Sequence, residues 1–359
     1  MKTLLFRDRR AAQIETDELR VTVTQEGGHI AEIFDKKSQI NPLWIPQWRS
    51  IEPSEYSPDL HREYGHSDEA QLVAGLLGHN ICLDLFGPPD SSEAAAGMPV
   101  HGEAAVAPYT IQGSENTLTM EAHLPKAEMT FRRRVTLNRG GIICFEESVR
   151  NHSCTDRPIG WTQHVTLGAP FLERGSTRFL LSAGRSKVYE QDFNDGLAKQ
   201  VPGAVFNWPF CPMKDGTIDD FSTLTSKEVS GGFTAHLMNL EEKHAFFLAW
   251  SPIHQLAFGY VWERSDFPWL SRWEENHLRP WAPWNSGGFA LGMEFGVSPM
   301  VESRRAMVAR GRMFGTPTFR WIPAKSDCTA SYCAFLKEAG SMPSGVQWDG
   351  ESITTIVSS

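Results

Sequence analysis

Long amphipathic helices are missing from this chain of 359 residues. Such helices repeat apolar residues every third or fourth position, and almost no extended stretch here has that spacing. This excludes a helical bundle. No apolar run reaches the roughly 20 residues of a membrane-spanning helix. No unit of about 20 to 50 residues repeats either, which disfavours a propeller or a solenoid.

An excess of positive charge is also missing. The 34 Lys and Arg residues stand against 43 Asp and Glu, which gives a net charge of -9. A nucleic-acid-binding domain typically carries a basic stripe, so no such partner is expected. The opening MKTLLFRDRR breaks its apolar run at Arg7, whereas a secretory signal has a longer apolar core. We therefore expect a cytoplasmic protein with neither a nucleic-acid nor a membrane partner.

Paired cysteine motifs and nucleotide-binding motifs are missing too. Six cysteines are scattered without a C-x-x-C pair, and a chain of this size does not need disulfides for stability. We expect mostly buried thiols. The sequence has no P-loop, dinucleotide fingerprint or G-x-S-x-G elbow. It therefore predicts neither a metal nor an organic cofactor. The cysteines are Cys82, Cys144, Cys154, Cys211, Cys328 and Cys333.

Short runs with a period of two residues fill most of the chain. LRVTVT at 19–24 alternates, and the runs at 129–137 and 142–151 flank the turn sequence NRGG. These two runs predict a hairpin. Strands without intervening helices indicate antiparallel packing, and so many of them indicate two large packed sheets or a barrel. Further strands or strand pairs are predicted at 233–240, 244–252, 255–263, 287–297, 302–313 and 329–337.

No linker divides the chain, so we predict one all-β domain over residues 1–359. Its core would run from about residue 15 to 340, followed by a polar tail at 341–359. The Pro-, Ser- and Gly-rich loops at 46–70 and 86–100 are candidates for function. Arg132, Arg133 and Arg134 are expected to be mostly solvated, although alternation places Arg133 on the face opposite its neighbours.

Glu294 is the least ordinary residue, because it lies in the apolar run GGFALGMEFGV. A buried carboxylate costs several kcal/mol unless it is paired or protonated. Burial also raises the pKa of a carboxyl group toward the range of a general acid or base. The alternative is a structural salt bridge to Arg304 or Arg305.

Two histidines are further candidates. His101 follows a Pro-rich loop in MPVHGEAA, where His101 could donate to a sugar hydroxyl and Glu103 could accept from one. His164 is central to the strand-like run GWTQHVTLGAPFL, and a histidine exchanges protons readily near neutral pH. Trp161, in the same run, could form an aromatic wall. A purely structural role is the alternative for each of these residues.

Tryptophans cluster between residues 250 and 284, where six of the twelve occur. Sugars present patches of C–H that pack on aromatic faces, so a few of these side chains are candidates for ligand contact. Trp262 and Trp273, which are flanked by acidic residues and Asn276, are the two we select. Ordinary core packing accounts for most of the others.

Taken in order, these segments resemble the galactose mutarotase-like superfamily, the aldose 1-epimerase family. The likeness rests on GGHIAEIF, NPLW, the His101–Gly102 pair, FEESVRN with DRP, His164, and GMEFGVSP. It implies a β-supersandwich of antiparallel strands with a sugar site in a concave groove. It also implies that His164 is the general acid, Glu294 the general base and His101 a sugar-positioning residue. Ala105 departs from the arginine that family members often carry.

The leading hypothesis is therefore an isomerase that interconverts the anomers of a small-molecule sugar, as a monomer or homodimer. A sugar-binding protein without catalysis is the first alternative, prompted by Ala105. A lyase or glycoside hydrolase is the second. A glycosidase needs two carboxyl groups beside the scissile bond. The candidate partners for Glu294 in that reaction are Asp192, Asp195 and Glu103.

Overall fold

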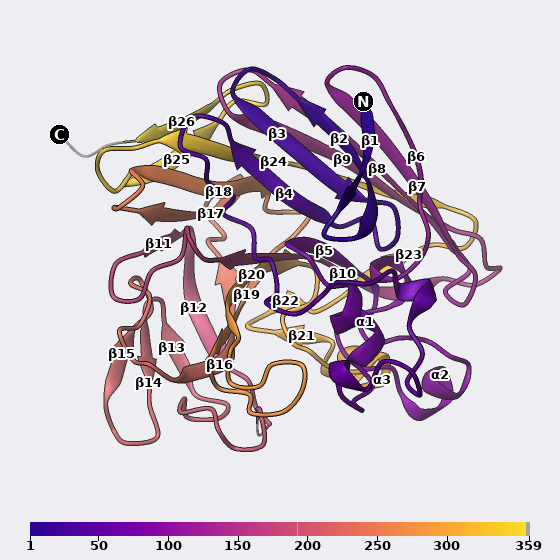
Figure 1. Cartoon of the computed structure of the whole chain (residues 1–359). Coiled ribbons are helices and arrows are strands. Elements are labelled where there is room, and N and C mark those ends of the chain that lie inside the picture. Colours follow the sequence, from indigo (N-terminus) through magenta and orange to yellow (C-terminus); the bar gives the residue numbers. More distant parts are fainter. Residues whose placement is uncertain (192, 357–359) are drawn as a thin grey trace.

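Two large antiparallel sheets form the computed structural model of this chain, which describes residues 1–191 and 193–356 (Figure 1). The first sheet has twelve strands and the second has eight. The predicted all-β, antiparallel sandwich is confirmed. Asp192, one of the carboxylates considered above, lies outside the described residues.

The twelve-stranded sheet runs in the order β1-β2-β3-β4-β5-β10-β20-β19-β16-β12-β13, and β23 pairs with β10. Its strands are β1 (Lys2–Phe6), β2 (Arg9–Glu15), β3 (Leu19–Thr24), β4 (Ile30–Asp35), β5 (His79–Asp84), β10 (Arg157–Gly168), β12 (Ala183–Val188), β13 (Val205–Asn207), β16 (Ser230–Met238), β19 (Trp269–Asn276), β20 (Phe289–Gly296) and β23 (Arg320–Ile322).

The eight-stranded sheet runs in the order β11-β17-β18-β24-β9-β8-β7-β6. Its strands are β6 (Thr110–Gly113), β7 (Thr117–Leu124), β8 (Met129–Asn138), β9 (Ile142–Asn151), β11 (Arg178–Leu181), β17 (His244–Ser251), β18 (Leu256–Glu263) and β24 (Asp327–Glu338). Three small hairpins are β14 (Phe210–Pro212) with β15 (Ile218–Asp220), β21 (Arg312–Met313) with β22 (Thr316–Pro317), and β25 (Gly345–Trp348) with β26 (Ile353–Ile356).

Helices are few and short, and they gather at one side of the molecule below β5 and β10 in Figure 1. They are α1 (Ala70–Gly75), α2 (Ser91–Ala95) and α3 (Arg304–Arg310), with 3-10 turns η1 (Pro53–Glu55), η2 (Arg62–Tyr64) and η3 (Glu103–Ala105). Within the described residues, none of these helices is long and apolar enough to cross a membrane.

The pattern of burial separates the outer strands from the central ones. In β7 every second residue is buried, as expected for a strand with one face on the core and one toward solvent. In β10, ten consecutive residues from 159 to 168 are buried, and β5 and β19 are buried throughout. These central strands are covered on both faces. Polar side chains along them are therefore withdrawn from bulk water.

A buried polar network joins the two sheets behind β10. Arg133 of β8 is ion-paired with Glu147 of β9 at 2.7 Å, and both side chains are fully buried. Gln163 of β10 donates to Glu147 at 2.7 Å and accepts from Arg133 at 2.9 Å. Tyr332 of β24 donates to Glu147 at 2.7 Å. The paired charges are thus further compensated by hydrogen bonds from two other strands, β10 and β24.

Four expectations need correction. Arg133 is buried rather than solvated, because its side chain points between the sheets. Residues 304–310 form helix α3 instead of a strand, since Ser303 caps its first turn and Gly311 ends it at a φ of 66°. Cys144 and Cys333 face each other on β9 and β24 and form a disulfide. Cys154 is exposed.

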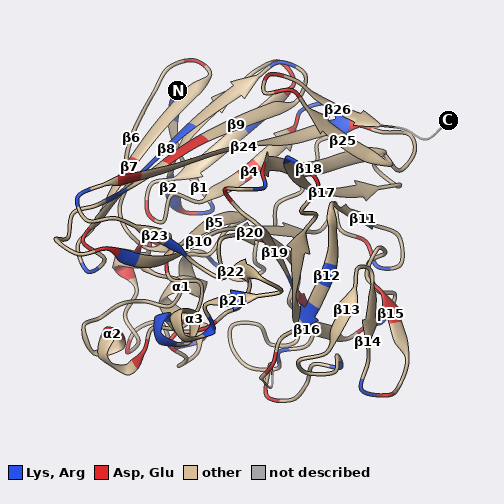
Figure 2. Cartoon of the chain, turned by 180° about the vertical axis from the view of Figure 1, so that it is seen from behind, with Lys and Arg blue, Asp and Glu red and all other residues tan. Residues whose placement is uncertain are grey.

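The C-terminal stretch is more structured than its polar composition suggests. The hairpin β25–β26 lies within the residues predicted as a tail, and its Ile353 is buried against the outer face of the eight-stranded sheet, near Phe335. Elsewhere, acidic and basic residues are interspersed along the chain, as Figure 2 shows from behind.

The Arg133 network yields a test of stability. Arg133→Met should lower the free energy of unfolding by about 3–5 kcal/mol, because it leaves Glu147 buried without its ion-pair partner. Urea denaturation measures the change. Arg134→Met is the control, because Arg134 is 57% exposed and 3.9 Å from Glu146. It should cost less than about 1 kcal/mol, and equal losses from both substitutions would contradict the assignment.

Candidate active site

The register of three central strands brings His164, Glu294 and Asn80 side by side. In the antiparallel pairing, His164 of β10 lies opposite Glu294 of β20 and opposite Asn80 of β5. Residues directly opposite one another in antiparallel strands point to the same face of the sheet. Nε2 of His164 lies 3.1 Å from Oε1 of Glu294. An imidazole and a carboxyl group are thus within proton-transfer reach at the floor of a cleft.

His101 approaches the same floor from the loop between α2 and η3. It has a φ of 65°, and Gly102 follows with a φ of 78°. A Cβ on Gly102 would lie 2.1 Å from the carbonyl oxygen of Leu83, so only glycine fits against β5 here. The His101 ring centroid lies 5.6 Å from that of His164. The His-Gly pair therefore serves to bring this loop onto the sheet.

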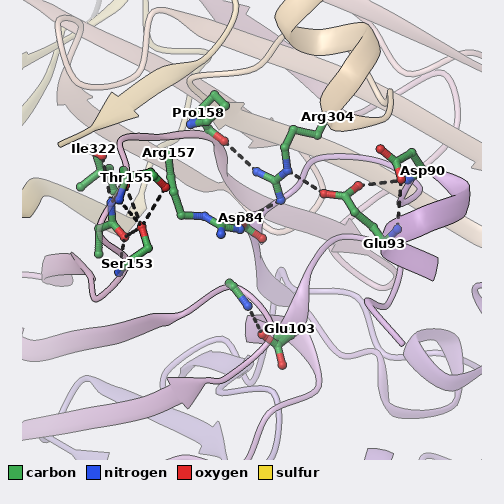
Figure 3. A network of polar contacts seen from close by, with 12 residues as sticks. Asp84, Asp90, Glu93, Glu103, Ser153, Thr155, Arg157, Pro158, Arg304 and Ile322 are labelled. Carbon is green, nitrogen blue, oxygen red and sulfur yellow. Dashed lines mark hydrogen bonds and ion pairs between the residues drawn. The ribbon is translucent and has the colours of Figure 1, made fainter. Parts of the chain in front are cut away.

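A polar network fixes the helices beside this loop (Figure 3). Asp84, the last residue of β5, accepts from Arg304 of α3 at 2.8 Å and from Arg157 of β10 at 3.2 Å. Arg304 also donates to Glu93 of α2 at 2.6 Å and to the carbonyl of Pro158 at 2.7 Å. These contacts tie α2 and α3 to β5 and β10, and so hold the segment that carries His101.

Aromatic and aliphatic side chains form the walls of the cleft. Trp273 of β19 lies with its ring centroid 6.0 Å from that of His164 and 5.8 Å from that of Trp284. Phe233 of β16 and the α1 segment complete the walls. The empty space of the cleft is about 570 Å³, a figure that includes open solvent at its mouth. The α1 segment contributes Leu72, Val73 and Leu76.

Several buried polar atoms at the floor have no hydrogen-bond partner among the described residues. They are both amide atoms of Asn80, Nδ1 of His101, and Oε1 of Glu294, which lies 3.1 Å from Nε2 of His164 without the alignment of a hydrogen bond. Buried polar groups in proteins are nearly always hydrogen-bonded, and leaving one unpaired costs about 1–3 kcal/mol. Such groups gathered in one cleft are typical of a site that completes its hydrogen bonds with a polar ligand.

Burial sets the protonation of the acid–base pair. It raises the pKa of Glu294 well above its ordinary value. It also lowers the pKa of His164 to about 3, with His101 adding to the effect, and that of His101 to about 4. In the free protein, burial therefore favours the neutral forms of both groups, which places the proton of the pair on Glu294 rather than on His164.

Four of the predicted site residues line the cleft: His101, His164, Glu294 and Trp273. Glu294 forms no salt bridge to Arg304 or Arg305; among described residues its ionisable neighbour is His164, and Arg304 pairs with Asp84 and Glu93. The structural alternative considered for Glu294 is therefore wrong.

Three predicted site residues do not line the cleft. Trp161 is an odd number of residues from His164, so it faces the opposite side of β10 and donates to Glu147 in the core. Trp262 is on β18 of the other sheet, stacked on Phe295 with centroids 4.2 Å apart. Glu103 accepts from the backbone of Ala127 at 2.8 Å. The two tryptophans lie away from the cleft because a strand's sequence fixes which residues alternate but not which sheet face they occupy, whereas Glu103 belongs to the 3-10 turn η3.

The lining residues that the sequence analysis missed include Asn80, Trp284 and Arg279. Asn80 had a signal, because it is a polar residue within the buried strand HNICLD. Trp284 belonged to the tryptophan cluster but was not selected. Arg279 lies in the loop after β19, where nothing in the local sequence distinguishes it. No group of three metal-ligating side chains occurs anywhere in the described part of the chain.

No family model and no curated protein matches this sequence. Solved structures do match. A protein provisionally named aldose 1-epimerase from Klebsiella pneumoniae subsp. pneumoniae shares 13% identity at a TM-score of 0.66, over 93% of this chain and 80% of that one. A galactose mutarotase related enzyme from Lactobacillus acidophilus shares 10% identity at a TM-score of 0.58, over 92% and 98%.

A third structure, a galactose mutarotase-like protein from Clostridium acetobutylicum, shares 10% identity at a TM-score of 0.59, over 94% of this chain and 98% of that one. The chain therefore has the galactose mutarotase-like fold, in a sequence far diverged from these structures. The resemblance predicted from the order of the motifs is confirmed for the fold.

The buried histidines generate a prediction about acid stability. The pKa is lowered by burial to about 3 for His29, His164 and His236 and to about 4 for His101. Below pH 6.5 the unfolded chain binds protons at these residues and the folded chain does not. As the pH is lowered below 6.5, the free energy of unfolding should therefore fall by up to about 1.4 kcal/mol per pH unit for each histidine.

Glu294 opposes this trend above pH 4.5, because burial raises its pKa in the folded chain. Urea denaturation between pH 7 and 5 measures the balance. A free energy of unfolding that stays constant or increases as the pH is lowered from 7 to 5 would contradict the burial of these neutral imidazoles.

Proposed function

We propose that this protein interconverts the anomers of a sugar, as an aldose 1-epimerase-like isomerase. The observation that carries the proposal is the 3.1 Å approach of His164 to Glu294 at the floor of a cleft with unpaired polar atoms. Trp273 and Trp284 supply aromatic faces for the C–H surface of a pyranose. The solved structures of the same fold support this proposal through their names.

Anomer exchange needs a proton to leave the hydroxyl on C1 and another to reach the ring oxygen. The C1–O5 bond then breaks, the aldehyde rotates, and the ring closes on either face. Glu294 and His164 together supply one acceptor and one donor, and the pair holds the same number of protons before and after ring opening. His101 and Asn80 would bind neighbouring hydroxyl groups.

The pair can begin the reaction in either of two arrangements. With Glu294 as base and His164 as acid, the carboxylate accepts from C1–OH while the imidazolium protonates O5. Burial of the free site favours the alternative distribution, in which Glu294 holds the proton and His164 is neutral. The two arrangements differ only by a proton moved across 3.1 Å. Binding of a polar sugar, which returns hydrogen bonds to both groups, would set their balance.

Loss of either member should reduce catalysis strongly. We expect Glu294→Gln and His164→Asn each to lower kcat by about 10²–10⁴-fold, the usual contribution of a positioned acid or base. Saturation-transfer NMR or polarimetry across neutral aldoses measures the exchange of anomers. Glu263→Gln is the matched control, because Glu263 lies opposite His244 on the other sheet, at 3.3 Å, in an equivalent cross-strand pair.

The control should retain full activity. The proposal would be rejected if the wild type accelerates the anomer exchange of no sugar, or if Glu294→Gln exchanges anomers as fast as the wild type.

A sugar-binding protein without catalysis is the second candidate, favoured by Ala105. This residue is buried in η3, and its carbonyl accepts from His29 at 2.9 Å, so it contributes no polar side chain to a ligand. Calorimetric binding of a sugar together with absent anomer exchange would favour this candidate. Catalysis that is lost in Glu294→Gln would exclude it.

A further inference from the structure

Arg279 stands out among the side chains that line the cleft, because it is the one cation there within the described residues. It follows β19 in the loop that leads to β20, and its side chain is 12% exposed. The guanidinium carbon lies 5.4 Å from the ring centroid of Trp273 and 5.0 Å from that of Trp284. The planar group therefore lies against the same aromatic walls that a sugar would contact.

The guanidinium is held in place from one side. Its Nε donates to Oδ1 of Asn194 at 2.9 Å and lies 3.4 Å from Oε2 of Glu275. Within the described residues, Nη1 and Nη2 make no hydrogen bond, and Nη1 lies 3.9 Å from Oε2 of Glu69. The stem and Nε are thus anchored, while the two terminal nitrogens form a pair of donors that no described residue engages.

Two carboxylates balance the charge of Arg279. Glu275 is fully buried and also accepts from the backbone of Leu278 and Arg279. Glu69, at the start of α1, is 44% exposed and lies at the cleft. Glu275 neutralises part of the charge of Arg279 from behind, and an anionic sugar, such as a uronate or a sugar phosphate, would meet Glu69 at the cleft, where no second cation among the described residues offsets it. A neutral sugar can instead use the free nitrogens as directional donors.

From this geometry we propose that Arg279 is the specificity-determining residue of the cleft, binding adjacent hydroxyl groups of a neutral sugar through its terminal nitrogens. In this role Arg279 supplies a cationic donor, which the alanine at position 105 cannot supply. Glu69 disfavours anionic sugars at the mouth. The inference rests on the proposed function for its substrate class, and binding measurements test it separately.

The test compares Arg279→Met and Arg279→Lys with the wild type. Arg279→Met should raise KM and the calorimetric Kd for neutral aldoses by about 10- to 100-fold, the loss expected for hydrogen bonds from a charged donor. The kcat should remain within about threefold, because Arg279 does not touch the reacting atoms. Arg279→Lys should recover only part of the affinity, since an ammonium lacks the planar pair of donors.

A matched control separates recognition from stability. Arg174 lies over Phe289 at 4.7 Å and donates its Nε to Asn276 at 2.9 Å, an arrangement much like that of Arg279 but away from the cleft. Arg174→Met should change the melting temperature about as much as Arg279→Met does, and should leave KM and Kd unaltered.

Glu69→Gln tests the charge balance directly. It should strengthen binding of D-glucuronate or D-galacturonate about two- to fivefold, the range measured for exposed ion pairs, and leave D-glucose and D-galactose unchanged. Unchanged uronate binding would overturn the role of Glu69. Neutral-sugar affinity that survives in Arg279→Met would overturn the role of Arg279.

These outcomes are distinct from failure of the proposed function. If the wild type binds a sugar without exchanging its anomers, and Arg279→Met abolishes that binding, the inference about Arg279 stands and the isomerase activity is rejected. If Arg279→Met exchanges anomers with an unaltered KM, the isomerase activity stands and the inference about Arg279 is rejected. A wild type that neither binds nor converts any sugar of the panel would overturn both.

Discussion

His164 lies opposite Glu294 on one neighbouring strand and opposite Asn80 on the other, and this register governs the whole site. Side chains alternate along a strand, so a shift of β10 by one residue would turn His164 toward the core and bring Gln163 or Val165 into the cleft. The proposed chemistry therefore depends on strand pairing more than on any single contact. The pairing of β10 with β20 thus sets the 3.1 Å distance between Nε2 of His164 and Oε1 of Glu294.

The opposite face of β10 explains why that register is fixed. Gln163 hydrogen-bonds to Glu147, Arg133 and Tyr332 in the space between the sheets. A slipped strand would bury the Arg133–Glu147 pair without these partners, and unpaired buried charges are strongly destabilising. The site has unpaired polar atoms on one face of the strand and a fully connected network on the other. The first face can bind a ligand because the second face stabilises the strand.

Much of the fold could be predicted from the sequence, because alternation in runs such as β7 and β8 is a local property. His101, His164 and Glu294 were also accessible, since they occur in motifs whose order is diagnostic. The errors have a common cause. Trp161 and Trp262 are of a residue type that commonly lines sugar sites, but which face or sheet they occupy depends on pairing with distant strands. Arg279 reaches the cleft through a loop, where no periodicity reports its direction.

The proposed chemistry requires His164 and Glu294 to contact one sugar ring together. A crystal structure with a bound neutral aldose would show this contact. The C1 hydroxyl and the ring oxygen should each lie within about 2.6–3.2 Å of one of these two side chains, with the ring against Trp273. A sugar bound elsewhere, or held in the cleft with C1 directed away from both residues, would contradict it.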